Sequence, residues 1–190
     1  MTAARTGNRP FRFSREQYYR LGELGFFDGK RVERIHGEIV EMSPIGWPHI
    51  VGCRKTAELL EELFAGVAWV SRNEQPIALA DSDPQPDVLV VPGRFEDYSN
   101  HPTTAWLVVE VSDTTLTRDT TIKAEMYAAA GIADYWVLDL NHRELLVFRD
   151  PATRPDGAAE YRTRLAFDAS QSVSPLAAPT VSVRVADLLP

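Results

Sequence analysis

The sequence predicts a mixed α/β fold, an α+β arrangement in which helices flank a central sheet. Residues 87–91 and 106–112 are almost continuously apolar, which indicates strands covered on both faces, as in the centre of such a sheet. Residues 49–64 and 120–131 place apolar side chains at helical spacing. With residues 67–72 as a first strand, the core order is helix, strand, strand, strand, helix, strand.

A helix and a hairpin are predicted before this core. Ser14 is followed three residues later by Gln17, a capping-box pattern, which predicts a helix over residues 15–24. Residues 31–42 alternate between polar and apolar side chains around a central His-Gly pair, which predicts a hairpin with a tight turn.

Further strands and turn-rich segments are predicted after residue 64. The strand at residues 67–72 has a possible continuation at 75–80, and residues 92–102 read as a polar loop. After the second core helix we expect a strand at residues 134–140, a hairpin turn at 141–144 and a second strand at 145–149. A loop at 150–157, an alternating edge strand at 160–167 and a tail with one short strand at 174–190 should follow.

Length and composition are those of an ordinary globular protein. The chain has 190 residues, of which 44% are hydrophobic and 25% charged, so we expect one domain over residues 1–190 with a flexible segment at 1–12. No segment has the pattern of a signal peptide or a membrane span, so we expect a cytoplasmic protein without membrane contact. The one cysteine, Cys53, excludes an internal disulfide.

The formal net charge of −7 argues against broad electrostatic adhesion to nucleic acid. It leaves room for a local basic strip, for which the candidates are Arg54, Lys55, Arg72 and Arg118.

Two carboxylates interrupt segments that should pack a core. Asp87 opens one apolar run, and Glu110 lies inside the next. Neighbouring strands lie only ~5 Å apart, so antiparallel pairing would bring both carboxylates to one edge of the sheet. A hard divalent cation such as Mg²⁺ would relieve their repulsion, and it could also polarise a phosphoryl oxygen and lower the pKa of a bound water.

Phosphodiester hydrolysis also needs a positive group near the reacting phosphate. Lys123 lies in the first turn of the helix predicted after the strand of Glu110, so its side chain can reach back to the same edge. Asp119 is placed to cap that helix and to fix the direction of the lysine.

These residues resemble a known family. Pro86-Asp87, the "EVS" at residues 110–112 and the run "RDTTIKAEMYAAAGIADYWVLD" at 118–139 resemble the Uma-type putative restriction endonuclease family, a branch of the PD-(D/E)xK nuclease superfamily. The resemblance covers residues 13–148. It implies a restriction-endonuclease-like core with an N-terminal helix and hairpin and C-terminal strands added, which agrees with the element order above.

The resemblance implies a metal-dependent endonuclease that acts on nucleic acid, with DNA as the expected substrate and 5′-phosphate products. Ser112 stands where the superfamily pattern has a lysine, and Lys123 matches the place to which related families move it. Analogy with nucleases that cut two strands predicts a homodimer. The implied ligands of Mg²⁺ or Mn²⁺ are Asp87, Glu110, the backbone carbonyl of Val111 and, at a recurrent acidic position, Glu38.

Simpler structural explanations exist for individual residues. Asp87 could be a turn residue that opens a strand, Lys123 a solvated helix residue, and Glu38 a neighbour of the hairpin turn. His49 lies near Cys53, but zinc sites need three or four ligands and the histidines are scattered, so we expect His49 to pack or to cap its helix.

A different function is also compatible with the sequence. The fold could persist as a non-catalytic scaffold that binds nucleic acid or forms oligomers. The acidic net charge and the serine at position 112 favour that alternative.

Overall fold

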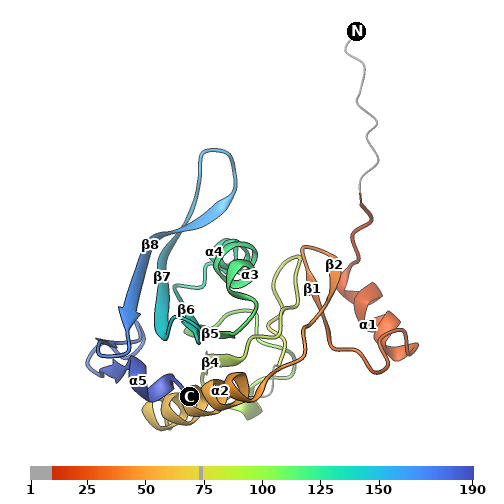
Figure 1. The fold of residues 1–190 in the computed structure, drawn as a ribbon. Helices are drawn as coiled ribbons and strands as arrows, with labels where there is room; N and C mark the ends of the chain where they lie inside the picture. The colour runs from red at the N-terminus through yellow and green to blue at the C-terminus, as the bar shows by residue number, and fades with distance from the viewer. Residues whose placement is uncertain (1–9, 73–74) are drawn as a thin grey trace.

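A six-stranded sheet forms the centre of the molecule in the computed structural model, which describes residues 10–72 and 75–190 (Figure 1). Its strand order is β3-β4-β5-β6-β7-β8, and β5 pairs with β6 in parallel while the other neighbours are antiparallel. The predicted mixed sheet is therefore confirmed. The strands are β3 (Ala68–Ser71), β4 (Val88–Pro92), β5 (Leu107–Ser112), β6 (Asp134–Asp139), β7 (Glu144–Thr153) and β8 (Ala159–Asp168).

Helices cover both faces of this sheet, and side chains alternate between the two apolar layers they form. On one face, α2 (Trp47–Leu63) and α5 (Val185–Leu188) pack against residues such as Val90 and Val109. On the other, α4 (Ala124–Ala129) packs against residues such as Val108. Burial on both faces explains why β4 and β5 lack polar alternation.

The helix that carries Lys123 starts earlier than the sequence predicts. A continuous helical run begins with α3 (Leu116–Arg118), passes through a π-helical segment, η2 (Asp119–Lys123), and continues as α4. Lys123 is therefore in the middle of the run, and the expectation that it lies in the first turn was wrong. π-Helical segments insert one residue into a turn and are frequent at functional sites.

The N-terminal elements form as predicted. In α1 (Arg15–Glu23), the Gln17 amide donates to Ser14 Oγ at 3.2 Å and the Ser14 amide donates to Gln17 Oε1 at 2.9 Å, which completes the capping box. β1 (Val32–Ile35) pairs with β2 (Glu38–Glu41) through a two-residue turn whose φ angles are both positive, as this turn type requires.

A buried ion pair fixes the hairpin to the rest of the molecule. The Arg34 guanidinium donates to Asp83 Oδ2 at 2.7 Å and to the Asp81 carbonyl at 2.7 Å. Arg15 donates to the other oxygen of Asp83 at 2.7 Å, so α1 and β1 share one fully buried carboxylate. This pairing holds β1, and with it Glu33, against the segment that leads into β4.

Other boundaries differ from the sequence prediction. Residues 75–80 contain no strand, so the proposed continuation was wrong. β7 extends through Pro151 into the expected loop, and α2 begins at Trp47. The tail at residues 174–190 holds one short strand, β10 (Val183–Arg184), as expected. It pairs with β9 (Ser172–Val173), a short strand just before the tail that was not expected. The expectation of flexibility at 1–12 falls mainly on residues 1–9, which lie outside the described residues.

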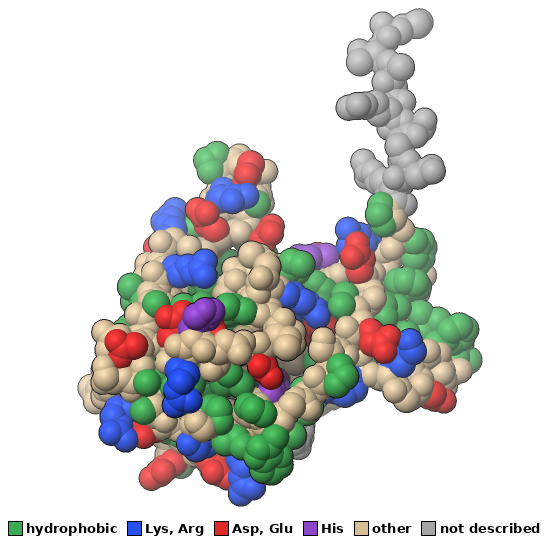
Figure 2. Space-filling model, in the orientation of Figure 1, with side chains coloured by type: hydrophobic (Ala, Val, Ile, Leu, Met, Phe, Trp, Pro, Cys, Tyr) green, Lys and Arg blue, Asp and Glu red, His purple; other side chains and the backbone are tan. Residues whose placement is uncertain are grey.

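Charge is finely mixed over the surface. The face in Figure 2 intersperses basic and acidic side chains without an extended field of one sign. Among the described residues, no helix combines the length and apolarity needed to cross a bilayer.

The hairpin turn should be sensitive to an added side chain. Gly37 has φ +74°, and a Cβ there would lie 2.9 Å from Arg12 Cβ and 3.3 Å from the Phe13 carbonyl oxygen. Gly29 has the same φ but open space around it. We expect Gly37→Ala to lower the free energy of unfolding by more than the ~1–2 kcal/mol that positive φ costs a residue with a side chain.

Gly29→Ala is the matched control for the backbone strain alone. The measurement is urea unfolding of both variants followed by circular dichroism. Equal losses in the two variants would show that the close approach at Gly37 contributes nothing.

Candidate active site

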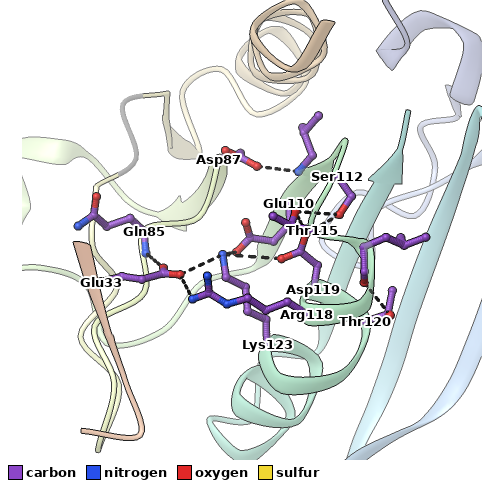
Figure 3. A network of polar contacts seen from close by, with 12 residues as sticks. Glu33, Gln85, Asp87, Glu110, Ser112, Thr115, Arg118, Asp119, Thr120 and Lys123 are labelled. Carbon is purple, nitrogen blue, oxygen red and sulfur yellow. Dashed lines mark hydrogen bonds and ion pairs between the residues drawn. The ribbon is translucent and has the colours of Figure 1, made fainter. Parts of the chain in front are cut away.

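The strand register brings Asp87 and Glu110 together. Val88 of β4 is opposite Val109 of β5 in an antiparallel pair, so Asp87, which directly precedes β4, and Glu110, which directly follows Val109, lie at the same end of this pair. Both side chains are buried, at 7% and 3% exposure, and both line one cleft (Figure 3).

Asp87 is held by the neighbouring strand and by α2. Its Oδ2 accepts a hydrogen bond from the Val111 amide at 2.7 Å and lies 3.3 Å from His49 Nε2. The expectation that Asp87 opens the strand agrees with this position, since β4 begins at the next residue. Its hydrogen bond crosses to β5, however, so Asp87 does more than close a local turn.

Glu110 forms a buried ion pair with Lys123. Lys123 Nζ donates to Glu110 Oε1 at 2.8 Å, and the Tyr127 hydroxyl donates to the same oxygen at 2.9 Å. Lys123 is only 5% exposed, so it is not a solvated helix residue. The η2 segment and α4 thus supply two donors to one carboxylate on β5.

A further acidic residue, Glu33, enters the cleft from the hairpin. Its Oε1 forms an ion pair with Arg118 and lies 3.8 Å from Lys123 Nζ. Its Oε2 accepts a hydrogen bond from the backbone N–H of Gln85 at 3.2 Å. Glu38, the hairpin residue expected in the metal shell, is half exposed and pairs with Arg12 at 2.9 Å. The structure brings Glu33 into the cleft and leaves Glu38 outside it.

Ser112 has a partner of its own. Its hydroxyl donates to Asp119 Oδ2, which also accepts from Thr115 Oγ1 at 2.6 Å, and Asp119 Oδ1 lies 4.0 Å from Lys123 Nζ. Asp119 does not cap the helix, because the helical run begins at Leu116. It instead ties β5 to the π-helical segment that positions Lys123.

The cleft buries more acidic than basic groups. We call it the acidic cleft; among its described lining residues, five are acidic and three basic: Glu33, Asp87, Glu110, Asp113 and Asp119 against Arg31, Arg118 and Lys123. This surplus must be balanced by protons or by a bound cation, because isolated buried charges are costly.

Titration behaviour reflects the surplus. Burial raises the pKa of Glu110 well above 4.5; Lys123 opposes this shift, while Asp87 adds to it. Burial lowers the pKa of Lys123, but Glu110, Glu33 and Asp119 outweigh it, so the lysine pKa is raised and the ammonium stays charged. Burial also raises the pKa of Tyr127 well above 10.0, so its hydroxyl remains a donor.

The donor set fits a hard divalent cation. Carboxylate oxygens and backbone carbonyls are the ligands Mg²⁺ takes, together with retained waters, and one or two carboxylates suffice. Asp87 and Glu110 supply these on adjacent strands, Val111 lines the same cleft, and Glu33 adds a carboxylate nearby. A cation beside Lys123 and Arg118 could bind a phosphate and increase its electrophilicity.

The expected basic strip is only partly assembled. Arg118 lies in the acidic cleft and pairs with Glu33, while Arg54 and Arg72 line an adjoining pocket. Lys55 donates to the Leu189 carbonyl at 2.6 Å, on the side of α2 that meets α5.

Sequence reasoning missed Glu33 because of its local pattern. It adjoins a second charged residue, Arg34, within a four-residue strand, so the alternation of polar and apolar residues does not show which of the two side chains points inward. Both are buried, as are the four residues of β1 together. A charged residue in a short strand next to a tight turn was the only signal available.

Comparison with known proteins relates this chain to a protein family and to a solved structure. A family model, Uma2, described as "Putative restriction endonuclease", matches residues 15–186. A crystal structure of a putative nuclease belonging to DUF820 from Anabaena variabilis ATCC 29413 is similar at a TM-score of 0.68 and 16% identity, and the match covers 91% of this chain and 95% of that one. At this identity the second match shows the fold. The comparison with curated proteins finds no match.

Removing the lysine should expose the cost of the buried acids. We expect Lys123→Met to lower the free energy of unfolding by ~3–5 kcal/mol at neutral pH, because Glu110 is left unpaired. Adding Glu110→Gln to that variant should restore part of the loss. The cost should also shrink at acidic pH, since the raised pKa of Glu110 lets its carboxyl take a proton there.

Lys30→Met is the matched control, because Lys30 pairs with Glu41 at 2.8 Å on the exposed surface and such pairs contribute under ~1 kcal/mol. Urea unfolding at several pH values gives the free energy of unfolding of the unaltered protein, the two Lys123→Met variants and Lys30→Met. A Lys123 variant as stable as the Lys30 variant would contradict the buried ion pair.

Proposed function

Because this chain belongs to the Uma2 family, whose description is "Putative restriction endonuclease", we propose that it is a divalent-metal-dependent endonuclease that hydrolyses phosphodiester bonds in DNA. Its family and fold are those of a restriction-endonuclease-like nuclease. The observation that best supports the finer proposal is that Asp87, Glu110 and Lys123 line one cleft, although they come from two strands and a helix.

In the proposed mechanism, Asp87 and Glu110 bind Mg²⁺ or Mn²⁺, and the Val111 carbonyl adds a neutral ligand. When bound, the ion supplies charge that polarises a phosphoryl oxygen and lowers the pKa of a coordinated water. The Val111 amide fixes Asp87 through its 2.7 Å hydrogen bond, and the Tyr127 hydroxyl fixes Glu110. Both carboxylates are thus oriented before an ion arrives, which reduces the ordering that binding requires.

Lys123 orients the attacking water and offsets charge that builds on the phosphate. Its ammonium lies within 4.0 Å of Glu110, Glu33 and Asp119, so it can move its hydrogen bonds among three carboxylates without leaving the cleft. Once Glu110 is shared with a cation, the lysine is free to donate to the water or to a phosphate oxygen. Burial lowers the pKa of Lys123, but Glu110, Glu33 and Asp119 raise it further, which favours a role by charge and hydrogen bonding rather than as a base.

Arg118 and Arg31 line the same cleft and would contact the scissile phosphate or its neighbour. Attack in line with the leaving oxygen would leave a 5′-phosphate, as the superfamily resemblance implies. A homodimer would allow both strands of a duplex to be cut, one by each copy.

One observation favours the alternative, a non-catalytic scaffold that binds nucleic acid. Lys123 and Glu110 already neutralise one another at 2.8 Å, and a protein that had lost its metal site could keep this pair for stability. Titration with Mn²⁺ distinguishes the two functions, since only the enzyme needs an ion at Asp87 and Glu110.

Loss of either metal ligand should abolish cleavage. We expect Asp87→Ala and Glu110→Ala each to lower the rate of plasmid nicking in Mg²⁺ or Mn²⁺ by at least ~100-fold, because the cation would lose one of two carboxylate ligands. Glu96→Ala, which removes an exposed carboxylate from the loop after β4, is the matched control. Undiminished cutting by the cleft variants would reject the assignment.

Glu33 and Glu38, two of the glutamates in the hairpin, give a second test. Glu33→Gln should weaken Mn²⁺ binding by ~10-fold or more, because Glu33 lies beside Lys123 and Arg118 in the cleft. Glu38→Gln should leave the Mn²⁺ affinity near that of the unaltered protein, since Glu38 pairs with Arg12 outside the cleft. Isothermal titration measures both, and the reverse order of effects would return the metal role to Glu38.

A further inference from the structure

A second group of metal-ligating side chains lies on the α2 side of Asp87. His49 and Cys53 are one helical turn apart on α2, and their side chains face the same way. Ligand atoms of His49, Cys53 and Asp87 all lie within 4.8 Å of one another. The sequence alone pairs only His49 with Cys53. Asp87 follows more than thirty residues later in the chain, after β3, so its approach to them is visible only in the structure.

We propose that His49, Cys53 and Asp87 form a binding site for a thiophilic divalent cation such as Zn²⁺, next to the site for a hard cation in the acidic cleft and sharing Asp87 with it. Cys, His and Asp are all zinc ligands, and sites with three protein ligands leave a fourth position for water. A thiolate ligand selects against Mg²⁺, so the two sites differ in the ions they prefer.

The distances suit a tetrahedral ion. Zinc bonds of about 2.1 Å to nitrogen and oxygen and 2.3 Å to sulfur imply ligand separations of ~3.4 Å between N and O and ~3.6 Å between N and S. His49 Nε2 lies 3.3 Å from Asp87 Oδ2 and 4.0 Å from Cys53 Sγ. Cys53 Sγ now lies 3.3 Å from the other ring nitrogen, Nδ1, so it must turn from Nδ1 toward Nε2 to share one ion with His49 and Asp87.

The surroundings allow an ion to enter and bind. A surface pocket lined by His49, Cys53 and Asp87 also contains Arg54 and Arg72. Each arginine is already neutralised by a carboxylate, Arg54 by Glu58 and Arg72 by Glu61. The pocket therefore does not present unpaired positive charge to a cation. Binding replaces the thiol proton, which is released to solvent.

Asp87 belongs both to the proposed zinc site and to the proposed magnesium site, so an ion in one site affects binding in the other. An ion held through Asp87 Oδ2 would draw this carboxylate toward α2 and compete with Mg²⁺ for it. This consequence rests on the proposed nuclease function; the binding site itself does not. Zinc would then act as an inhibitor of cleavage.

Cobalt substitution tests the site directly. The full chain is titrated with Co²⁺, and we expect a thiolate-to-cobalt charge-transfer band that saturates at one equivalent and disappears on addition of Zn²⁺. Cys53 is the only cysteine of the chain, so the band reports on this residue alone. Cys53→Ser should abolish the band, and His49→Ala should weaken Co²⁺ binding by at least ~10-fold.

Two matched variants separate this site from its neighbours. His142→Ala alters the histidine beside Asp139, and Glu110→Gln disables the proposed nuclease site; both should keep the band. Absence of the band in the unaltered protein, or unchanged Co²⁺ affinity in His49→Ala, would overturn the proposal. Zinc inhibition of Mg²⁺-dependent cleavage is measured separately and should require at least ~10-fold more Zn²⁺ in Cys53→Ser. Equal inhibition of both proteins would overturn the regulatory consequence while leaving cleavage itself intact.

Discussion

Burial of more carboxylates than cations in one cleft is the constraint on which the rest of the site depends. Asp87 and Glu110 line the cleft at one end of the antiparallel β4–β5 pair, and Glu33 and Asp119 add negative charge around a single buried lysine. Protons and Lys123 can balance part of this charge, as the raised pKa of Glu110 reflects. A divalent cation would balance it more completely, so the proposed metal site would link the stability of the fold to the proposed catalytic function.

The backbone places these charges through three different devices. The β4–β5 register brings the two carboxylates to the same end of the strand pair, and the β1–β2 hairpin delivers Glu33 because Arg34 anchors it to Asp83. The π-helical segment turns Lys123 toward β5, with Ser112 bonded to Asp119 at its start. Ser112 therefore has a structural role at the position where the superfamily pattern has a lysine.

Local patterns in the sequence were sufficient for some of these features and not for others. A carboxylate inside an apolar run is conspicuous, so Asp87 and Glu110 could be selected without a structure. The start of the helix at Leu116 was hidden by threonines, which have low helix propensity. The place of Glu33 beside Lys123 and the approach of Asp87 to His49 depend on contacts between segments distant in the chain. The local periodicity of a sequence carries no information about such contacts.

The most direct test of the account is a crystal structure of the protein grown with Mn²⁺, with the ion located by anomalous scattering. The account predicts a peak within coordination distance of carboxylate oxygens from both Asp87 and Glu110, with Lys123 Nζ withdrawn from its 2.8 Å contact with Glu110. A cleft that excludes manganese at saturating concentration, with the Lys123–Glu110 pair unchanged, would contradict the metal site and with it the hydrolytic function.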